Sequence, residues 1–416
     1  MRDKLLRWLY SVLMIALSPF ILLRLLWRSR RAPDYRRRIT ERFAFYSRTF
    51  KPSGICLHAV SVGELMAARP LITRIMQHYP HLPLTITTTT PTASAQVKKI
   101  FADSVQHVYL PYDYPGAVQR FLRAFRPKLM IIMETEIWPN LFYYLHEANI
   151  PIIMANARLA EKSLRGYKRF KFFFAPTLQK VTCIAAQSVM DANHFAALSF
   201  PGQKIKVMGN IKYDVAVPTH LVERAHQLRK AWPDRAVWIA SSTHAVEEAL
   251  IINTIIALKT QYPHTLCIIA PRHPECFHGV AEKCVAQGLK IARYSRQEDV
   301  TPDTEVFIAD ALGELFFFYA LSDIAVVCGS FAPVGGHNVL EPAALGLPII
   351  VGPNMFNFKT ILADFLAKAA ILQVKEGEEL LPILGHTLAH PDAAQEMGER
   401  AHQLVLTNQG AIDNLW

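Results

Sequence analysis

The chain lacks the cysteine pattern that metal sites and disulfide frameworks require. Its six cysteines form no C-x-x-C pair, and most of them lie in apolar, strand-like runs. Structural zinc sites and disulfide-stapled domains use characteristic cysteine spacings, so neither is indicated here. We therefore expect buried free thiols, which pack as small apolar groups, and a reducing compartment.

Two sequence signatures of nucleotide binding are also missing. No G-x-G-x-x-G follows the first apolar run, and no Walker A sequence G-x-x-x-x-G-K-[ST] occurs. Binding of a dinucleotide or of ATP therefore lacks its usual support.

Acidic residues are scarce only at the N-terminal end. Residues 1–51 hold 13 Lys and Arg against 3 Asp and Glu, which leaves 32 (45 − 13) against 31 (34 − 3) in residues 52–416. The net charge of +11 thus comes almost entirely from the first segment. A nearly neutral body does not offer the basic surface that nucleic acid needs, so we expect no nucleic-acid partner.

The basic excess flanks an apolar stretch, "WLYSVLMIALSPFILL", at residues 8–23. As one helix this stretch would rise ~24 Å at ~1.5 Å per residue, against a hydrocarbon core of ~30 Å. We predict a membrane anchor over residues 1–28, and Pro19 leaves open a helix that enters the bilayer without crossing it. A cleaved signal peptide is the rival interpretation, but the basic run "RSRRAPDYRRR" follows the apolar stretch almost at once, which opposes translocation. The positive-inside rule then places residues 28–416 on the cytoplasmic side.

Beyond residue 52, short β-branched runs alternate with amphipathic helical segments. This alternation predicts parallel βαβ units covered on both faces. We expect two doubly wound, Rossmann-like α/β domains facing a cleft, at residues 29–212 and 235–416, with a polar connector at residues 213–234. In such sheets ligands bind outside the carboxyl ends of the strands, so the residues that follow each strand are the candidates for function.

The first candidate is Glu64 in "HAVSVGE", which follows the apolar run "GICL". Ser61 and Glu64 also fit the S-x-x-E capping box, in which both side chains satisfy amides at a helix start. From these residues alone, a helix cap and a catalytic carboxylate remain equally open.

Three further strand ends carry charged groups. "IIMETEIWPN" places Glu134 and Glu136 after an apolar run, "MGNIKYD" places Lys212 near the connector, and "IIAPRHPE" places Arg272 and His273 after another run. An arginine there can clamp a phosphate or a carboxylate. A surface salt bridge would explain any one of these charged residues. It explains less well why all of them directly follow a predicted strand.

The strongest phosphate-binding candidate is the glycine-rich segment at residues 326–353, "VVCGSFAPVGGHNVLEPAALGLPIIVGP". Gly335 and Gly336 would let the backbone approach a ligand, and the following amides would lie at a helix N-terminus that favours anions. Glu341 would then bind ribose hydroxyls. An ordinary turn with Asn338 or His337 as the helix cap is the alternative.

The ordered motifs carry a resemblance. The series "HAVSVGE", "TTTTPTAS", "YLPYD", "METEIWPN", "ANARL", "GNIKYD", "STH", "PRHPE", "GEL", "GGHNVLEP" and "FNFK" resembles the bacterial Kdo transferases, which transfer 3-deoxy-D-manno-oct-2-ulosonic acid (Kdo) to the lipid A precursor. The likeness covers nearly the whole chain. Cys276 stands where an arginine is common and Asn210 where a serine is common, which affects local contacts only.

The resemblance implies a GT-B glycosyltransferase of the inner membrane that uses CMP-Kdo as donor and the lipid A precursor as acceptor. It implies no cofactor and no divalent metal, and the sequence has no D-x-D pair at a strand end. Glu64 would be the base that deprotonates the acceptor hydroxyl, with inversion at the Kdo anomeric carbon, while Glu134 and Lys212 would stabilise the transition state. The residues that would hold CMP are Pro271, Arg272, Leu312, Gly313, Glu314, Asn338, Val339, Leu340 and Glu341.

Two other functions stay open at this point. One is a membrane-associated GT-B transferase that uses a UDP-sugar. The other is a membrane-anchored nucleotide-binding protein without turnover, in which Glu64 serves only as a cap.

Overall fold

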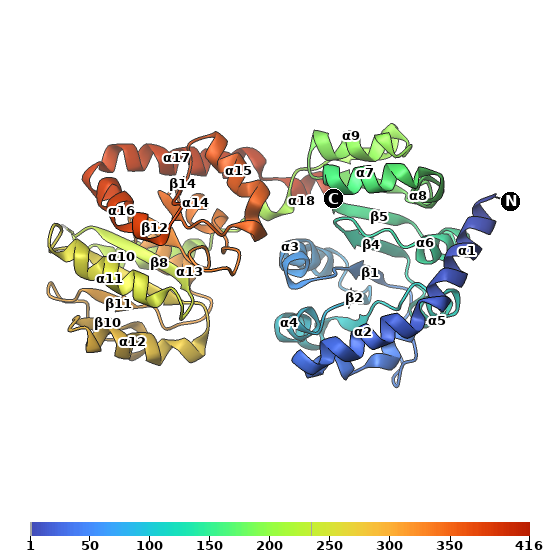
Figure 1. The fold of residues 1–416 in the computed structure, drawn as a ribbon, viewed down its shortest axis with the longest axis horizontal. Coiled ribbons are helices and arrows are strands. Elements are labelled where there is room, and N and C mark those ends of the chain that lie inside the picture. Colours follow the sequence, from blue (N-terminus) through green and yellow to red (C-terminus); the bar gives the residue numbers. More distant parts are fainter. Residues whose placement is uncertain (1, 234) are drawn as a thin grey trace. The chain divides into compact units, whose positions relative to one another are not determined.

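The computed structural model describes residues 2–233 and 235–416 (Figure 1). Met1 and Asp234, which fall within the predicted anchor and connector, lie outside the described residues. The chain divides into two compact units, one formed by Met1–Asp214 with Gly410–Trp416 and the other by Val215–Gln409. All six cysteines are free, and the expected burial holds for four of them, whereas Cys183 and Cys276 are partly exposed.

The first unit is built on a seven-stranded sheet in the order β3-β2-β1-β4-β5-β6-β7, and every strand pair is parallel. The strands are β1 (Ile55–His58), β2 (Leu84–Thr88), β3 (Gln106–Tyr109), β4 (Leu129–Met133), β5 (Ile152–Ala157), β6 (Cys183–Ala186) and β7 (Ile205–Val207). One face packs against α3 (Val62–His78), α4 (Pro91–Phe101) and α18 (Ala411–Leu415). The other packs against α5 (Pro115–Phe125), α6 (Pro139–Glu147), α7 (Glu161–Arg169), α8 (Lys171–Leu178) and α9 (Val189–Ala197).

The second unit repeats the plan with the order β10-β11-β9-β8-β12-β13-β14, again all parallel. Its strands are β8 (Val237–Thr243), β9 (Leu266–Pro271), β10 (Ile291–Arg293), β11 (Val306–Ile308), β12 (Ile324–Val327), β13 (Ile349–Val351) and β14 (Leu372–Gln373). Its helices are α10 (Thr219–Arg229), α11 (Glu248–Lys259), α12 (Phe277–Ala286), α13 (Leu315–Ala320), α14 (Leu340–Ala344), α15 (Lys359–Ala367), α16 (Leu380–Ala389) and α17 (Pro391–Asn408). The predicted α/β class with two doubly wound units is confirmed.

Each sheet has one topological switch point, where the strand order reverses and the crevice for a ligand opens. In the first unit it lies between β1 and β4, and in the second between β8 and β12. The segments that follow these four strands are therefore the places to look for a site.

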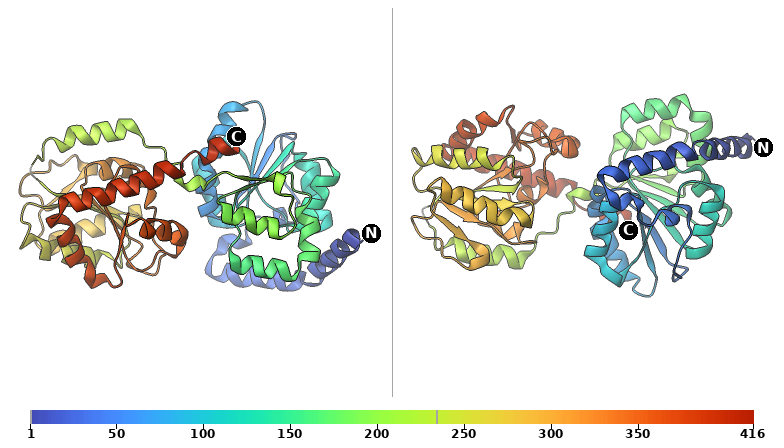
Figure 2. Two further views of the ribbon diagram at one scale, coloured as in Figure 1. Left: turned by 90° about the horizontal axis from the view of Figure 1, so that it is seen from above. Right: turned by 60° about the horizontal axis from the view of Figure 1, so that its bottom comes forward.

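The C-terminal end does not belong to the second unit, to which the sequence had assigned all of residues 235–416. It returns to the first unit, as the red segment marked C shows in Figure 2. The carboxylate of Asp214 accepts hydrogen bonds from the amides of Gly410 (2.6 Å) and Ile412 (2.7 Å). Ala411 and Ile412 also join the apolar cluster of α3 and α4, which holds the end of the chain in place.

The predicted connector at residues 213–234 is only partly a linker. It contains α10, whose Ala225 is fully buried with Phe317 and Phe318 of α13 in the core of the second unit. Apolar burial thus makes α10 part of that unit, and no long flexible connector is left between Asp214 and the helix.

The predicted anchor consists of two helices, α1 (Arg2–Ala16) and α2 (Ser18–Arg31). Pro19 stands in the first turn of α2, where it cannot donate to the carbonyl of the preceding turn, so the helix breaks at this point. No single helix in the described residues is long and apolar enough to cross a bilayer; the pair Lys4–Ala16 and Ser18–Arg30, bent by 48°, meets the length and composition test only when both are taken together.

Helix α1 turns a polar face toward the first unit. Arg7 Nη1 (3.1 Å) and Ser11 Oγ (3.2 Å) both donate to Oδ1 of Asn140, which is fully buried on α6. The Arg7 guanidinium also lies 3.9 Å above the ring of Tyr143. The side chains that remain exposed on α1 and α2 are largely apolar, with Trp8 59%, Ile15 60%, Phe20 69%, Leu23 62% and Trp27 60% exposed.

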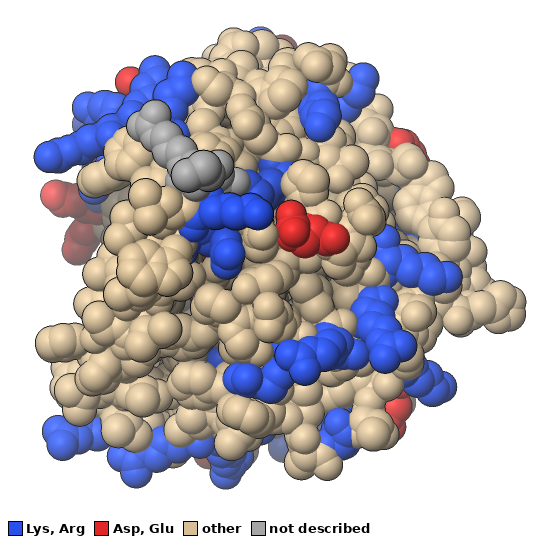
Figure 3. Space-filling view, turned by 90° about the vertical axis from the view of Figure 1, so that its right-hand side faces the viewer, with Lys and Arg blue, Asp and Glu red and all other residues tan. Residues whose placement is uncertain are grey.

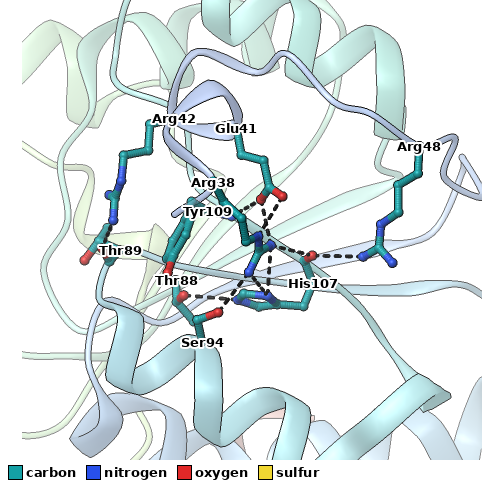
Figure 4. Close-up of polar contacts among 9 residues, drawn as sticks. All are labelled: Arg38, Glu41, Arg42, Arg48, Thr88, Thr89, Ser94, His107 and Tyr109. Atoms are coloured by element: carbon teal, nitrogen blue, oxygen red, sulfur yellow. Dashed lines mark hydrogen bonds and ion pairs between the residues drawn. The ribbon is translucent and has the colours of Figure 1, made fainter. Parts of the chain in front are cut away.

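Part of the basic segment that follows is structural (Figure 4). Arg38 donates to both carboxylate oxygens of Glu41 (2.7 and 2.6 Å) and to Ser94 Oγ (2.9 Å), next to the buried ring of His107. Arg42 is 4% exposed and donates to the Thr89 carbonyl (3.0 Å). These two guanidinium groups fix the segment to the edge of the sheet and are therefore not available as free surface charges.

Candidate functional site

The first unit carries a pocket of about 200 Å³ at its switch point. Its lining comes from the start of α3, the segment after β4 and the segment after β5, and consists of Glu64, Glu134, Thr135, Glu136, Arg158, Ala160 and Ser163. Three carboxylates from two strand ends thus meet in one place. The two glutamates that the sequence assigned to catalysis, Glu64 and Glu134, are both among them.

The local structure at Glu64 is the capping box that the sequence left open. Ser61 is the N-cap of α3, and its hydroxyl oxygen accepts a hydrogen bond from the amide of Glu64 (3.4 Å). The Glu64 carboxylate in turn accepts from the amide of Val60 (2.8 Å) and from the Ser61 hydroxyl (3.2 Å). These bonds orient the side chain but leave lone pairs on both oxygens, so the cap and a second role are compatible.

Two carboxyl groups in this pocket, those of Glu64 and Glu136, have raised pKa values. Burial raises the pKa of Glu64 to about 7, against the hydrogen bond from Val60, and the charges of Glu134 and Glu136 add to the rise. Burial likewise raises the pKa of Glu136 to about 7, and Glu134 contributes again. Desolvation and neighbouring like charges are the two ordinary causes of such a shift. A carboxyl with a pKa near neutrality can take and return a proton at physiological pH.

Glu134 is placed by an uncommon backbone conformation. The backbone φ of Glu134 is +55°, in the left-handed region that residues other than glycine and asparagine rarely adopt. The Glu134 amide donates a hydrogen bond to the Ala155 carbonyl (2.9 Å). This turn immediately after β4 brings Glu134 and Glu136 to the pocket, and Thr135 Oγ1 donates to the Arg158 carbonyl on the opposite wall. Backbone strain of this kind persists where the surrounding structure enforces it, and it is concentrated at functional sites.

Lys212 does not line this pocket. It lies in the short helix η5 (Ile211–Tyr213), where Asn210 Oδ1 accepts from the Lys212 amide (3.1 Å) and Asn156 Oδ1 from the Ile211 amide (3.1 Å). Ile211 packs in the same apolar cluster as Leu65 of α3. Lys212 therefore sits on an element that packs against α3, the helix that begins with Glu64 in its first turn.

Sequence reasoning missed Arg158 and Ser163 as pocket residues. Arg158 directly follows β5, in the motif "ANARL", and it is the one cation in the lining. The rule that function follows strand ends would have found Arg158 had it been applied to this strand. Ser163 lies inside α7, and nothing in its local sequence distinguishes it.

In the second unit, Pro271 and Arg272 lie at the end of β9, beside the switch point. Pro271 is buried, whereas the Arg272 side chain is exposed, and the Arg272 amide donates to the Thr243 carbonyl at the end of β8 (3.0 Å). The cation is thus held by its backbone at the carboxyl edge of the sheet, with its guanidinium free to meet a ligand.

The loop Leu312–Gly313–Glu314 follows β11. Leu312 is 60% exposed and Gly313 has a φ of +85°, a conformation that glycine adopts without strain. Glu314 accepts from the hydroxyl of Tyr294 (2.5 Å) and pairs with Arg224 of α10. The carboxylate of Glu314 is therefore already engaged, so the exposed backbone and Leu312 remain as the contact surface of this loop.

The segment Asn338–Glu341 precedes and opens α14, a helix of five residues. Val339 and Leu340 are buried in the core, so only their backbone groups can meet a ligand. Asn338 Oδ1 accepts from the Leu340 amide (3.1 Å) and its Nδ2 donates to Glu341 (3.0 Å), but the N-cap position of α14 is Val339, so neither Asn338 nor His337 is the helix cap. Burial raises the pKa of Glu341, against the hydrogen bond from Asn338 and the charge of Arg272.

Gly335 and Gly336 have a structural explanation that the sequence did not suggest. Their φ values are +106° and +76°, and an added Cβ would lie 2.4 Å from Asn357 Nδ2 at Gly335 and 2.1 Å from Met355 Sδ at Gly336. The glycines thus let the chain pass close to the "FNFK" segment. This close packing is sufficient to explain why glycine occupies both positions, without the approach of a ligand that the sequence suggested.

The described part of the chain places no group of three or more His, Cys, Asp or Glu side chains so that they could hold a metal ion.

Comparison with known proteins identifies the family of the chain. Residues 37–215 match the family model described as 3-Deoxy-D-manno-octulosonic-acid transferase (kdotransferase). A 3-deoxy-D-manno-octulosonic acid transferase of Haemophilus influenzae is 39% identical over 413 residues, covering 98% of this chain and 97% of the relative. One of Bordetella pertussis is 34% identical over 369 residues, covering 86% and 84%.

Solved structures match the fold. A glycosyltransferase from Rickettsia africae covers 88% of this chain and 96% of its own at a TM-score of 0.50, with 13% identity. The UDP-GlcNAc 2-epimerase of Neisseria meningitidis, bound to UDP-GlcNAc, covers 85% and 99% at 0.52, with 14% identity. These similarities concern the GT-B arrangement of two Rossmann-like units alone. Because relatives at 34–39% identity extend over most of its length, the chain belongs to the 3-deoxy-D-manno-octulosonic acid transferases and is a glycosyltransferase.

Proposed function

We propose that this chain transfers Kdo from CMP-Kdo to a hydroxyl of the lipid A precursor, with inversion at the anomeric carbon and release of CMP. The observation that carries the proposal is the Glu64 carboxylate, oriented by its own helix start inside a pocket of like charges. Family membership supports Kdo as the group transferred. In this proposal the first unit binds the acceptor and the second unit binds the donor.

Glu64 is the general base. Its ionised carboxylate takes the proton of the acceptor hydroxyl while that oxygen bonds to the anomeric carbon of Kdo. The bond between this carbon and the phosphate oxygen breaks, and CMP leaves with the electron pair. The pKa of about 7 suits this task, because a base is most effective when its pKa lies close to the working pH. Glu134 supports the step twice, by raising the pKa of Glu64 and by stabilising positive charge that develops on the sugar.

The donor is held at the carboxyl edge of the second sheet. Arg272 meets the phosphate, the loop at residues 312–314 and the backbone of Asn338–Leu340 contact the nucleotide, and Glu341 and Pro271 shape the floor. Lys212 stabilises the transition state in this proposal as a cation near the departing phosphate.

The protein acts at the cytoplasmic face of the inner membrane. Supporting this are the exposed apolar side chains of α1 and α2, among them Trp8, Phe20 and Trp27. Lys and Arg side chains gather on the face of the first unit drawn in Figure 3, where few acidic side chains are seen. Apolar side chains beside clustered cations suit an anionic lipid surface, since the two attractions add.

The test is a transfer assay with the purified full chain, CMP-Kdo and a tetraacylated lipid A precursor. We expect release of CMP and an increase in acceptor mass by one or more Kdo units. UDP-sugars offered in place of CMP-Kdo serve as the control and should give no product. CMP-Kdo left intact by a folded preparation that binds both substrates would overturn the proposal.

A further inference from the structure

Three imidazoles meet at the switch point of the second unit. His244 follows β8, His273 follows β9, and His337 lies between β12 and α14, so they come from three neighbouring strands. The Nε2 atoms of His244 and His337 are 2.8 Å apart, and the two rings are parallel within 7°. The ring of His273 lies 5.5 Å from that of His244.

The His244–His337 pair is held by the fold from both sides. The His337 ring packs on Gly329, where a Cβ would come within 2.5 Å of its Cδ2 atom. Glu247 is 1% exposed and accepts hydrogen bonds from the amides of His244 (3.0 Å), Gly329 (2.8 Å) and Phe331 (3.0 Å). One buried carboxylate thus fixes both loops that carry the pair.

Hydrogen bonding between two Nε2 atoms limits the charge of the pair. One nitrogen must donate and the other must accept, so the pair is either neutral or carries one positive charge; a second added proton would break the bond. Burial lowers the pKa of His337 to about 4, and Arg272, His244 and His273 lower it further. Burial also lowers the pKa of His244. The charge of Glu247 raises this pKa, whereas His273 and Arg272 lower it further. The pair is therefore neutral at pH 7.

An anionic ligand beside Arg272 would reverse this balance. CMP-Kdo carries two negative charges, one on the phosphodiester and one on the sugar carboxylate, whereas Arg272 supplies one fixed positive charge at this edge. Glu247 accepts hydrogen bonds from three backbone amides, and Glu341 accepts one from Asn338, so both nearby carboxylates are engaged with other groups of the fold. An opposite charge within about 4–6 Å raises the pKa of an imidazole by roughly 1–3 units.

We propose that the His244–His337 pair is part of the donor site and binds one proton together with the donor. The pair would then supply the second positive charge only while the anionic ligand is present. This inference rests on the proposed function, because it takes CMP-Kdo as the ligand of this unit. It adds to the proposed donor site a pair of residues whose protonation depends on the charge of the bound donor.

The test measures binding of CMP-Kdo, offered without an acceptor, to the full chain between pH 5.5 and 8. This probe keeps its phosphodiester and its sugar carboxylate ionised over this range, so its two charges do not change. We expect affinity to increase as the pH falls, by up to about tenfold per pH unit for one linked proton. Calorimetry in two buffers of different ionisation enthalpy should report uptake of close to one proton.

His244→Asn and His337→Asn should each remove the proton uptake and flatten the pH dependence. His278→Asn is the matched control, because His278 is an exposed histidine of the same unit that pairs with Glu282. If a variant fails to fold, ring-nitrogen NMR of the wild type with and without the probe decides the question. Binding without proton uptake, or uptake retained in both folded variants, would overturn this inference alone. A wild-type chain that does not bind CMP-Kdo at any pH in this range would overturn the proposed donor site with it.

Discussion

The two switch points share one topology and carry opposite chemistry. In the first unit the segments after β1 and β4 bring together Glu64, Glu134 and Glu136. In the second, the segments after β8, β9 and β12 bring together Arg272 and three imidazoles. Burial acts on both sites and favours the uncharged form: it raises the pKa of Glu64 and of Glu136, and it lowers the pKa of His244 and of His337.

This contrast shows that the parallel sheet supplies position and the residues after each strand supply chemistry. A pocket of carboxylates is suited to taking a proton from a hydroxyl. A cationic edge is suited to an anionic donor and its leaving group. The proposed division of labour follows from this difference, and it can be tested by changing one site while measuring the other.

The largest expected effect is that of Glu64→Gln. Glutamine keeps the capping box but cannot accept a proton, so turnover should fall by roughly 10²–10⁴-fold while the fold and CMP affinity are retained. Rate assays, thermal melts and calorimetry on one preparation would check this. Glu147→Gln, at an exposed position at the end of α6, is the control and should be silent. Near-normal Kdo transfer by Glu64→Gln would mean that Glu64 serves only as a helix cap and is not the general base.

Arg272→Ala should give the opposite pattern. Loss of a charge-assisted hydrogen bond of roughly 1.5–3 kcal/mol weakens CMP binding by about 10- to 100-fold. The pH dependence set by Glu64 should stay as it is in the wild type. Because the side chain is exposed, the melting temperature should not change. Unchanged CMP affinity, measured by calorimetry, would remove Arg272 from the site.

The pocket of carboxylates should also make stability depend on pH. The pKa values of Glu64 and Glu136 are near 7 in the fold against an ordinary value of 4.5, so the folded state binds more protons between these limits. The free energy of unfolding should therefore fall as pH rises from about 4.5 to 7. Denaturant melts across this range should show a smaller fall for Glu64→Gln. An identical fall in both proteins would mean that Glu64 is not the group responsible.

The smallest effect concerns helix α1, which packs on α6 of the first unit. Arg7→Ala removes one of two donors to the buried Asn140 Oδ1 and the contact with Tyr143. A loss of ~1 kcal/mol should lower the Tm by about 2–4 °C. Hydrogen exchange should quicken in α6 and not in α11. Lys4→Ala, on an exposed position of the same helix, is the control, and an equal effect of the two changes would mean that the contact with Asn140 contributes nothing.

Most of the fold could be read from the sequence because long apolar runs mark buried parallel strands. Strands β10 and β14 are harder to recognise in the sequence, because they have only three and two residues and lie at the edges of their sheet. The return of residues 410–412 to the first unit was also not predictable, because it depends on the carboxylate of Asp214, which is far away in the sequence.

The candidate site could be predicted in part. Glu64 and Glu134 follow strands that the sequence identified, and the sheet order brings them together. Arg158 and the His244–His337 pair depend on which strands are neighbours, and strand order is a property of the tertiary fold. The raised pKa of Glu64 likewise depends on burial, which no local motif encodes.

The most direct test of the account is the pH dependence of Kdo transfer at saturating donor, for the wild type and for Glu134→Gln. At saturating donor concentration, changes of donor affinity with pH do not affect the measured rate. We predict that kcat of the wild type rises with pH and levels off with an apparent pKa near 7, the value for Glu64. In Glu134→Gln the midpoint should move to lower pH, because a neighbouring charge that raises this pKa is gone. A rate that is flat from pH 5 to 8, or a midpoint that Glu134→Gln leaves in place, would contradict a base held in a pocket of like charges.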